Sequence, residues 1–210
     1  MKVCGCRCPR HGPVRVLLVH QDHVRIHAMS NARTRRSRQA QAQFRFQRQR
    51  RLNALAQPGP RPLVVVLDHL KPNFNVGKIF RSAQAFGIRE VHLVGIDWFD
   101  PATAKGAFKR VPARFFDDFD QSYGLLSAQG YRIHVLDPSA GIALAECALP
   151  PLSAFVLGHE EFGVGFDPDR YPDLGRVCIH QVGSIDSLNV SVAASIAMYE
   201  FSRRHGGAGH

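Results

Sequence analysis

Short runs of Val, Ile, Leu and other apolar residues recur along the chain from residue 63 onward, and helical patterns separate them. Each run has the length of a buried strand, and strands that are buried on both faces occur mainly in parallel sheets covered by helices. The sequence therefore predicts an α/β domain with a mainly parallel sheet flanked by helices. The expected strands are Leu63–Leu67, Val91–Gly95, Arg132–Leu136, Ala154–Leu157 and Arg176–Ile179.

Helical spacing of apolar residues appears between these runs. The clearest case lies at the C-terminal end, where small apolar side chains form one stripe and Ser187 and Asn189 stand at the N-cap. Polar residues held at the mouth of a buried helix suit a ligand site, although an ordinary capped core helix has the same pattern. The expected helices begin near Val76, span Phe119–Gln129 and run over Val190–Arg204.

Basic residues are concentrated at the N-terminal end. Residues 1–51 hold 13 of the 27 Lys and Arg residues but one of the 17 acidic residues, Asp22. Such a segment attracts polyanions, with RNA or DNA as the obvious partner, although a solubilising tail has the same composition. Pro-rich residues then break the chain. We expect a basic N-terminal arm over residues 1–57, partly disordered or helical, a linker over 58–62 and a folded domain over 63–205.

Cysteine usage favours a reducing compartment. Cys4, Cys6 and Cys8 lie closer together than the paired ligands of a zinc knuckle, and nothing implies a disulfide framework. No apolar stretch approaches the length needed to cross a membrane, and no signal-peptide pattern is found. We therefore expect a cytoplasmic protein without a metal site or a membrane segment.

Donor side chains follow the first expected strand. Asn75 opens the next helix, Gly77 allows close backbone approach, and Lys78 and Arg81 lie within the first two turns. Together with the free N–H groups of the helix they form an anion pocket suited to a phosphate. A solvated edge of an amphipathic helix would carry similar residues, but Asn and Gly at this place do little for stability alone.

A glycine-rich turn with a carboxylate follows the strand Ala154–Leu157. Gly158 and Gly163 allow the backbone to turn sharply against a ligand, and Glu160 between them can accept hydrogen bonds. Glu160 and Glu161 do not suggest a glycosidase pair, because neighbouring side chains usually point apart. No dinucleotide-binding or P-loop fingerprint is present, which argues against nicotinamide dehydrogenases and P-loop nucleotidases.

The order and spacing of these segments resemble the SPOUT superfamily of RNA methyltransferases, in its TrmH/SpoU branch of ribose 2′-O-methyltransferases. The first family motif, N-x-G-x-x-x-R, is matched by Asn75, Gly77 and Arg81. The second, G-x-E-x-x-G, is matched over Gly158–Gly163. The third, I-P-M-x-G-x-x-x-S-L-N-V-S-x-A, is highly specific, and it is matched at Ile179, Gly183, Ser187, Leu188, Asn189, Val190, Ser191 and Ala193.

The resemblance, which covers residues 63 to about 204, implies a SPOUT-type domain with a C-terminal trefoil knot. It also implies S-adenosylmethionine as methyl donor, tRNA or rRNA as substrate, and a homodimer whose active site is completed across the interface. In the family pattern the motif-one arginine is the proton acceptor, but a guanidinium hardly ever loses its proton. We instead expect Arg81 to clamp a phosphate and stabilise developing oxyanion charge. The expected catalytic residues are Arg81, Asn75, Glu160, Ser187 and Asn189, and the expected cofactor contacts are Leu157, Gly158, Ile179, Gly183 and Leu188.

The chain departs from the family at two positions of the third motif, where His180 and Gln181 replace Pro and Met. We expect activity to survive, with an altered polarity or rigidity of the cofactor loop. A rival interpretation is a non-catalytic RNA-binding module that keeps the fold but not the activity. A hydrolase that uses Ser187 with a histidine is disfavoured, because no G-x-S-x-G elbow surrounds Ser187.

Overall fold

The computed structural model describes residues 36–185 and 187–206. The chain forms two compact units, residues 1–41 and 42–210. In the first unit, residues 36–41 are helical, and the rest of that unit, including the N-terminal cysteines, lies outside the described residues. The fold below is that of the second unit.

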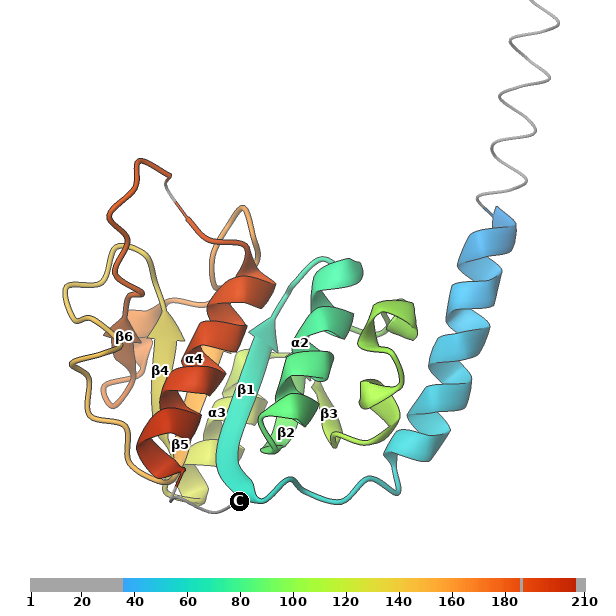
Figure 1. Cartoon of the computed structure of the whole chain (residues 1–210), viewed down its shortest axis with the longest axis horizontal. Helices are drawn as coiled ribbons and strands as arrows, with labels where there is room; N and C mark the ends of the chain where they lie inside the picture. Colours follow the sequence, from blue (N-terminus) through green and yellow to red (C-terminus); the bar gives the residue numbers. More distant parts are fainter. Residues whose placement is uncertain (1–35, 186, 207–210) are drawn as a thin grey trace, which may run out of the picture. The chain divides into compact units, whose positions relative to one another are not determined.

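One parallel sheet forms the centre of this unit (Figure 1). Its described part has six strands in the order β3-β2-β1-β5-β4-β6, and every neighbouring pair is parallel. This arrangement confirms the predicted α/β class. The strands are β1 (Arg61–Asp68), β2 (Ile88–Val94), β3 (Ala113–Phe116), β4 (Arg132–Leu136), β5 (Ser153–Leu157) and β6 (Gly175–Val177).

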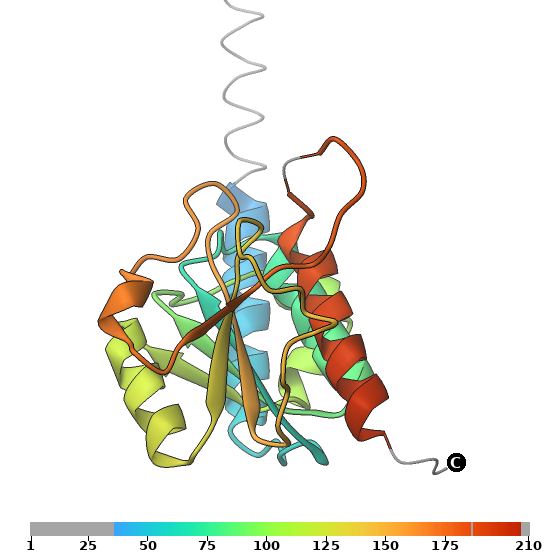
Figure 2. The same cartoon turned by 90° about the vertical axis from the view of Figure 1, so that its left-hand side faces the viewer.

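Helices cover both faces of the sheet (Figure 2). Successive β1 side chains point to opposite faces, so Val65 packs in the core with α2 and α4, whereas Val64 packs in the core with α3. Both side chains are buried, which explains the unbroken apolar run of this strand. The helices are α2 (Phe74–Ala85), α3 (Phe119–Ala128) and α4 (Val190–His205), with short 3₁₀ helices η1 (Pro101–Ala104), η2 (Ala107–Lys109) and η3 (Pro168–Arg170).

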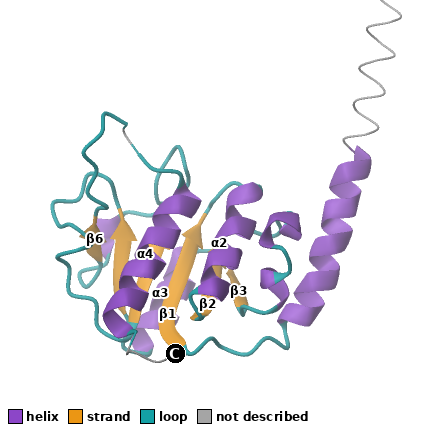
Figure 3. Cartoon of the chain, viewed as in Figure 1, coloured by secondary structure: helices purple, strands orange, loops and turns teal. Residues whose placement is uncertain are grey.

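The strand order reverses between β1 and β5, which lie side by side at the centre of the sheet. Their register pairs Leu67 with Leu157, so both strands end at the same edge. After β1 the chain continues toward β2, whereas after β5 it runs toward β6 on the other side. Loops gather above this edge (Figure 3). Ligands of open parallel sheets bind where such loops diverge.

The helical residues 42–53 contribute to the hydrophobic core. Phe46 is 1% exposed, and its ring lies 5.5 Å from that of Phe99 and 5.6 Å from that of Phe108. The buried Asn53 donates to the carbonyl of Val111 at 2.7 Å and accepts from the amide of Ala113 at 3.0 Å. The sequence prediction starts the folded domain at residue 63, because Arg and Gln dominate the composition around Phe46 and mask its apolar stripe.

The sequence prediction misses β3. This edge strand pairs only with β2, and its Ala-Arg-Phe-Phe sequence has neither a continuous apolar run nor strict alternation. The short helices η1 and η2 are missed as well, because two turns or fewer leave no helical period to detect. The other five strands and the three expected helices are confirmed, with small differences at their ends.

Phe46→Ala should lower the free energy of unfolding by about 3–5 kcal/mol, because it opens a cavity among buried aromatic rings. Phe44→Ala is the matched control, since Phe44 lies two residues away on the same helix and is 70% exposed. The control should stay within about 0.5 kcal/mol of the parent protein. Urea denaturation followed by circular dichroism measures both values. Equal losses in the two variants would contradict the packing of this helix.

Candidate active site

Three polar segments come together at the edge of the sheet where β1 and β5 end. The first opens α2 after β1, the second is the turn Gly158–Gly163 after β5, and the third leads into α4. These segments carry the three motifs identified in the sequence. Their convergence in one protomer is therefore observed, as the parallel sheet predicts.

Hydrogen bonds connect one side chain from each segment. The Asn75 side-chain amide donates to Glu160 Oε1 at 2.8 Å, and that of Asn189 donates to Asn75 Oδ1 at 3.4 Å. Asn189 is held in turn as the N-cap of α4, because its Oδ1 accepts from the backbone N–H of Ser191 at 3.0 Å and from its hydroxyl at 2.6 Å. The network thus fixes two amide groups and one carboxylate near the N-terminal end of α4.

Glu160 is held in its ionised form. Partial burial raises the pKa of this carboxyl, but the hydrogen bonds donated by Asn75 and by backbone N–H groups, including that of Lys71, outweigh burial and lower it. Because the pKa is lowered, the carboxylate remains a pure acceptor at neutral pH. Glu160 therefore orients Asn75 and has no proton to give.

The adjacent Glu161 points elsewhere. Its carboxylate pairs with the Lys71 ammonium at 2.7 Å in an exposed ion pair, and this hydrogen bond lowers the pKa of Glu161. Glu160 instead faces Asn75. The divergence agrees with the expectation that the two neighbouring carboxylates do not act as a pair.

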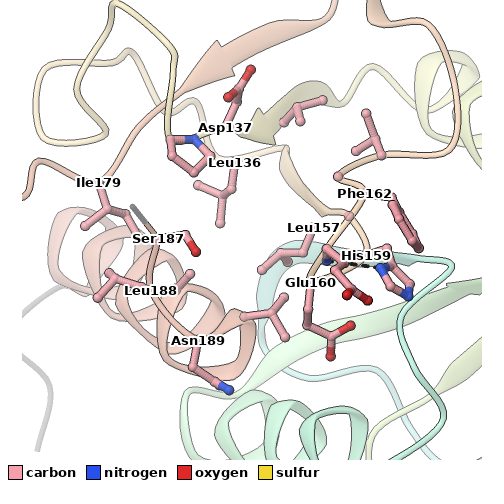
Figure 4. A pocket seen from close by; sticks show the side chains of 18 of the residues that line it. Leu136, Asp137, Leu157, His159, Glu160, Phe162, Ile179, Ser187, Leu188 and Asn189 are labelled. Atoms are coloured by element: carbon pink, nitrogen blue, oxygen red, sulfur yellow. Dashed lines mark hydrogen bonds between the residues drawn. The ribbon is translucent and has the colours of Figure 1, made fainter. Parts of the chain in front are cut away.

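A cavity of about 640 Å³ opens beside the network (Figure 4). Seven of the ten predicted site residues line it: Leu157, Gly158, Glu160, Ile179, Ser187, Leu188 and Asn189. Apolar walls come from the ends of β4, β5 and β6 and from the start of α4, and polar groups come from the segments that follow β4, β5 and β6. A mostly apolar cleft with a few placed polar groups is typical of a small-molecule site.

Two motif glycines are required by packing. A Cβ on Gly158 would lie 2.2 Å from the carbonyl carbon of Gly163, and Gly163 has a left-handed φ of +72°. A Cβ on Gly77 would lie 2.2 Å from Thr103 Oγ1, so this glycine lets α2 approach η1. The close approach expected at Gly77 is thus to another part of the chain.

Three predicted residues lie outside the cavity lining. Asn75 donates a hydrogen bond to Glu160, which does line the cavity. Gly183 lies in an exposed bend, where a Cβ would have no described atom within 4 Å. Arg81 is exposed on α2, and within the described residues no hydrogen bond joins it to Asn75, Ser187 or Asn189. Arg81 is six residues beyond Asn75, which rotates it to another side of the helix.

Some lining residues are not among the predicted ones. Asp137 and Pro138 follow β4, and Phe162 and Val164 lie in or after the second segment. The rule that ligands bind beyond the carboxyl ends of parallel strands could have identified Asp137. No comparable signal marks Phe162, because single apolar residues in loops are common.

The described residues offer no group of three or more His, Cys, Asp or Glu side chains that could hold a metal ion. In the same part of the chain, no helix combines the length and apolar character needed to cross a membrane. Cys147 and Cys178 are both free thiols.

Comparison with known proteins gives consistent matches. The tRNA (guanosine(18)-2'-O)-methyltransferase of Thermus thermophilus is 28% identical over 154 residues, which cover 70% of this chain and 77% of that protein. The 23S rRNA (guanosine-2'-O-)-methyltransferase RlmB of Nitrosomonas europaea is 33% identical over 159 residues, covering 73% of this chain and 60% of that protein. The crystal structure of the A. aeolicus TrmH/SpoU tRNA modifying enzyme has a TM-score of 0.64 at 25% identity, covering 76% and 83% of the two chains.

A family model supports the same assignment. The model of the SpoU rRNA Methylase family matches residues 62–199, which include the sheet, the three motif segments and most of α4. This agrees with the family resemblance drawn from the motifs. The chain belongs to the SpoU rRNA methylase family.

Proposed function

We propose that this chain is an S-adenosylmethionine-dependent RNA ribose 2′-O-methyltransferase that acts on tRNA or rRNA. The observation that carries the proposal is the hydrogen-bonded connection of Asn75, Glu160 and Asn189 beside one cavity. Similar proteins are named for 2′-O-methylation of guanosine in tRNA and in 23S rRNA. Transfer of a radiolabelled methyl group to total RNA tests the activity, and it separates an enzyme from an RNA-binding module that has lost catalysis.

The residues around the cavity fit an adenosyl cofactor. Leu157, Ile179 and Leu188 supply apolar walls for a flat base, and Gly158 leaves backbone exposed there. The side-chain oxygen of Gln181, another lining residue, is buried without a partner in the described structure, so the site has an unused acceptor. S-adenosylmethionine, when bound, supplies a methyl group on a positively charged sulfur.

The chain's own residues would position the ribose. Glu160 and Asn75 hold each other, and the Ser187 hydroxyl is exposed at the cavity, where it can bond a ribose or phosphate oxygen. Holding a 2′-oxygen in line with the methyl carbon supplies a large share of the rate in such reactions. The network around Glu160 provides the fixed frame for that alignment.

Arg81 would act between protomers. Because its side chain is exposed on α2 and does not line the cavity of its own protomer, we place it at the site of a second copy in a homodimer. There its guanidinium would clamp the phosphate beside the target ribose and stabilise developing negative charge. Exposed apolar side chains on α4, Val192 (47%) and Tyr199 (57%), support a helical face that a second copy can cover.

Three further features belong to the proposal, of which the first comes from the family resemblance. The segments that follow β5 and β6 would form the trefoil knot, with the cofactor among the knotted loops and Gly183 within them. The protein would act in the cytoplasm, which agrees with the cysteine usage of the sequence. The basic arm, of which most lies outside the described residues, would dock RNA by phosphate contacts.

Arg81→Ala should lower the rate of methyl transfer by about 10²–10³-fold or more, because a hydrogen-bond donor to the transition state is removed. S-adenosylhomocysteine should still bind within twofold of the parent affinity in calorimetry. Lys109→Ala, which removes another exposed basic side chain, is the control and should keep full activity. Near-normal methylation by the Arg81 variant would contradict the proposed role.

Removal of residues 1–41 should weaken RNA binding and make its salt dependence shallower, because counterion release falls with each lost phosphate contact. The deletion stops before the core residue Phe46, so the fold is retained. Fluorescence anisotropy between low and moderate KCl measures the slope, and calorimetry checks that cofactor affinity is unchanged. An unaltered slope would show that the arm does not dock RNA.

Gln181→Met, which restores the family residue, should raise the free energy of unfolding by about 1–2 kcal/mol in the cofactor-free protein, because the buried side-chain oxygen lacks a partner and its removal relieves a desolvation cost. Gln84→Met on the exposed side of α2 is the control, with no expected change. Urea denaturation gives both values. Destabilisation by the Gln181 change would mean that the amide is already satisfied.

A further inference from the structure

Phe162 is a large apolar side chain that the fold leaves in solvent at the rim of the cavity. Phe162 is 81% exposed, and it is one of the residues that line the cavity. One ring face lies against the imidazole of His159, with centroids 4.8 Å apart and planes inclined by 23° (Figure 4). The fold thus forgoes the stabilisation that burial of a Phe side chain would give.

The turn that carries Phe162 is fixed on several sides. His159 and Gly163 exchange two backbone hydrogen bonds, at 2.7 and 2.9 Å. The Glu161 amide donates to His159 Nδ1 at 3.1 Å, and the Glu161 carboxylate pairs with Lys71. An aromatic ring on such a turn is held in place before any ligand arrives, so little conformational entropy remains to be lost on binding.

The surroundings of the ring favour RNA over a second copy of the chain. Glu160, Glu161 and Lys71 lie around this turn, and the centre of a homodimer interface is depleted in charged residues. Unpaired RNA bases, in contrast, stack on exposed aromatic rings and tolerate polar neighbours. The proposed function brings a ribose to the Glu160 network, two residues from Phe162.

We propose that the Phe162 ring, supported by His159, is a stacking platform for an unpaired nucleobase of the RNA substrate close to the methylated nucleotide. This inference rests on the proposed function, since it takes RNA as the ligand. Stacking makes no phosphate contact, so Phe162 contributes affinity that does not depend on salt. It selects single-stranded or flipped-out nucleotides over paired ones.

Phe162→Trp gives a direct spectroscopic test. Trp98 is the only natural tryptophan, and it packs against the core, so the introduced indole is the exposed emitter. Titration with a single-stranded RNA 12-mer should quench the added fluorescence, whereas a duplex of the same length should not. Absence of quenching at RNA concentrations that saturate binding would overturn the proposal.

Phe162→Ala should weaken binding of the same 12-mer by about 5- to 150-fold, which corresponds to the loss of one stacked base. The salt slope should not change, and Phe162→Trp should keep the parent RNA affinity. Leu152→Ala, an exposed apolar change just before β5, is the matched control. Unchanged RNA affinity in the alanine variant would refute stacking.

Sedimentation of the parent protein and of Phe162→Ala tests whether a second copy of the chain covers the ring in place of RNA. A shift to smaller species in the alanine variant would show that a second copy covers the ring, and the proposal would fall. Methyl transfer by the parent protein is scored separately. If the parent transfers no methyl group but the introduced tryptophan is quenched by single-stranded RNA, the proposed function fails while the stacking surface stands.

Discussion

The hydrogen bond between Asn75 and Glu160 holds the site together, because it joins segments 85 residues apart in the chain. It forms only because β1 and β5 are neighbours and end in register, which places the start of α2 opposite the turn after β5. An ionised carboxylate accepts this bond more strongly than a neutral carboxyl group, and the lowered pKa of Glu160 keeps it ionised at neutral pH. Sheet topology thus determines which side chains meet, and the ionised state of Glu160 strengthens the hydrogen bond between them.

The motif residues divide into those that build the site and those that face a ligand. Gly77 and Gly158 are required by contacts with Thr103 and Gly163 within the chain, and Asn189 caps α4. Leu157, Ile179 and Leu188 instead present apolar surface to the cavity. A motif match therefore identifies the family without showing which of its residues touch a ligand, since packing constrains a sequence as strongly as binding does.

Buried strands and amphipathic helices could be predicted from the sequence because their periods are strong. The edge strand β3 could not, since it is short, and neither could the packing of helical residues 42–53 into the core, since Phe46 lies among Arg and Gln. The convergence of the three segments followed from the parallel sheet. The exposure of Arg81 and of Phe162 depends on which face of a helix or turn meets solvent, and spacing along the chain does not determine that.

In the proposed function, RNA affinity and RNA positioning have different physical sources. Residues 42–210, which include the folded unit, hold 18 Lys and Arg against 16 Asp and Glu, whereas residues 1–41 hold nine against one, so most of the net positive charge lies at the N-terminal end. In the proposed function, long-range attraction to RNA comes mainly from the basic arm, and such attraction is sensitive to salt and indifferent to sequence. Positioning of the target nucleotide comes, in this proposal, from short-range contacts at the cavity. Stacking and hydrogen bonds there are screened little by salt. Since the two act over different distances, mutations in the arm and at the rim should affect RNA binding independently.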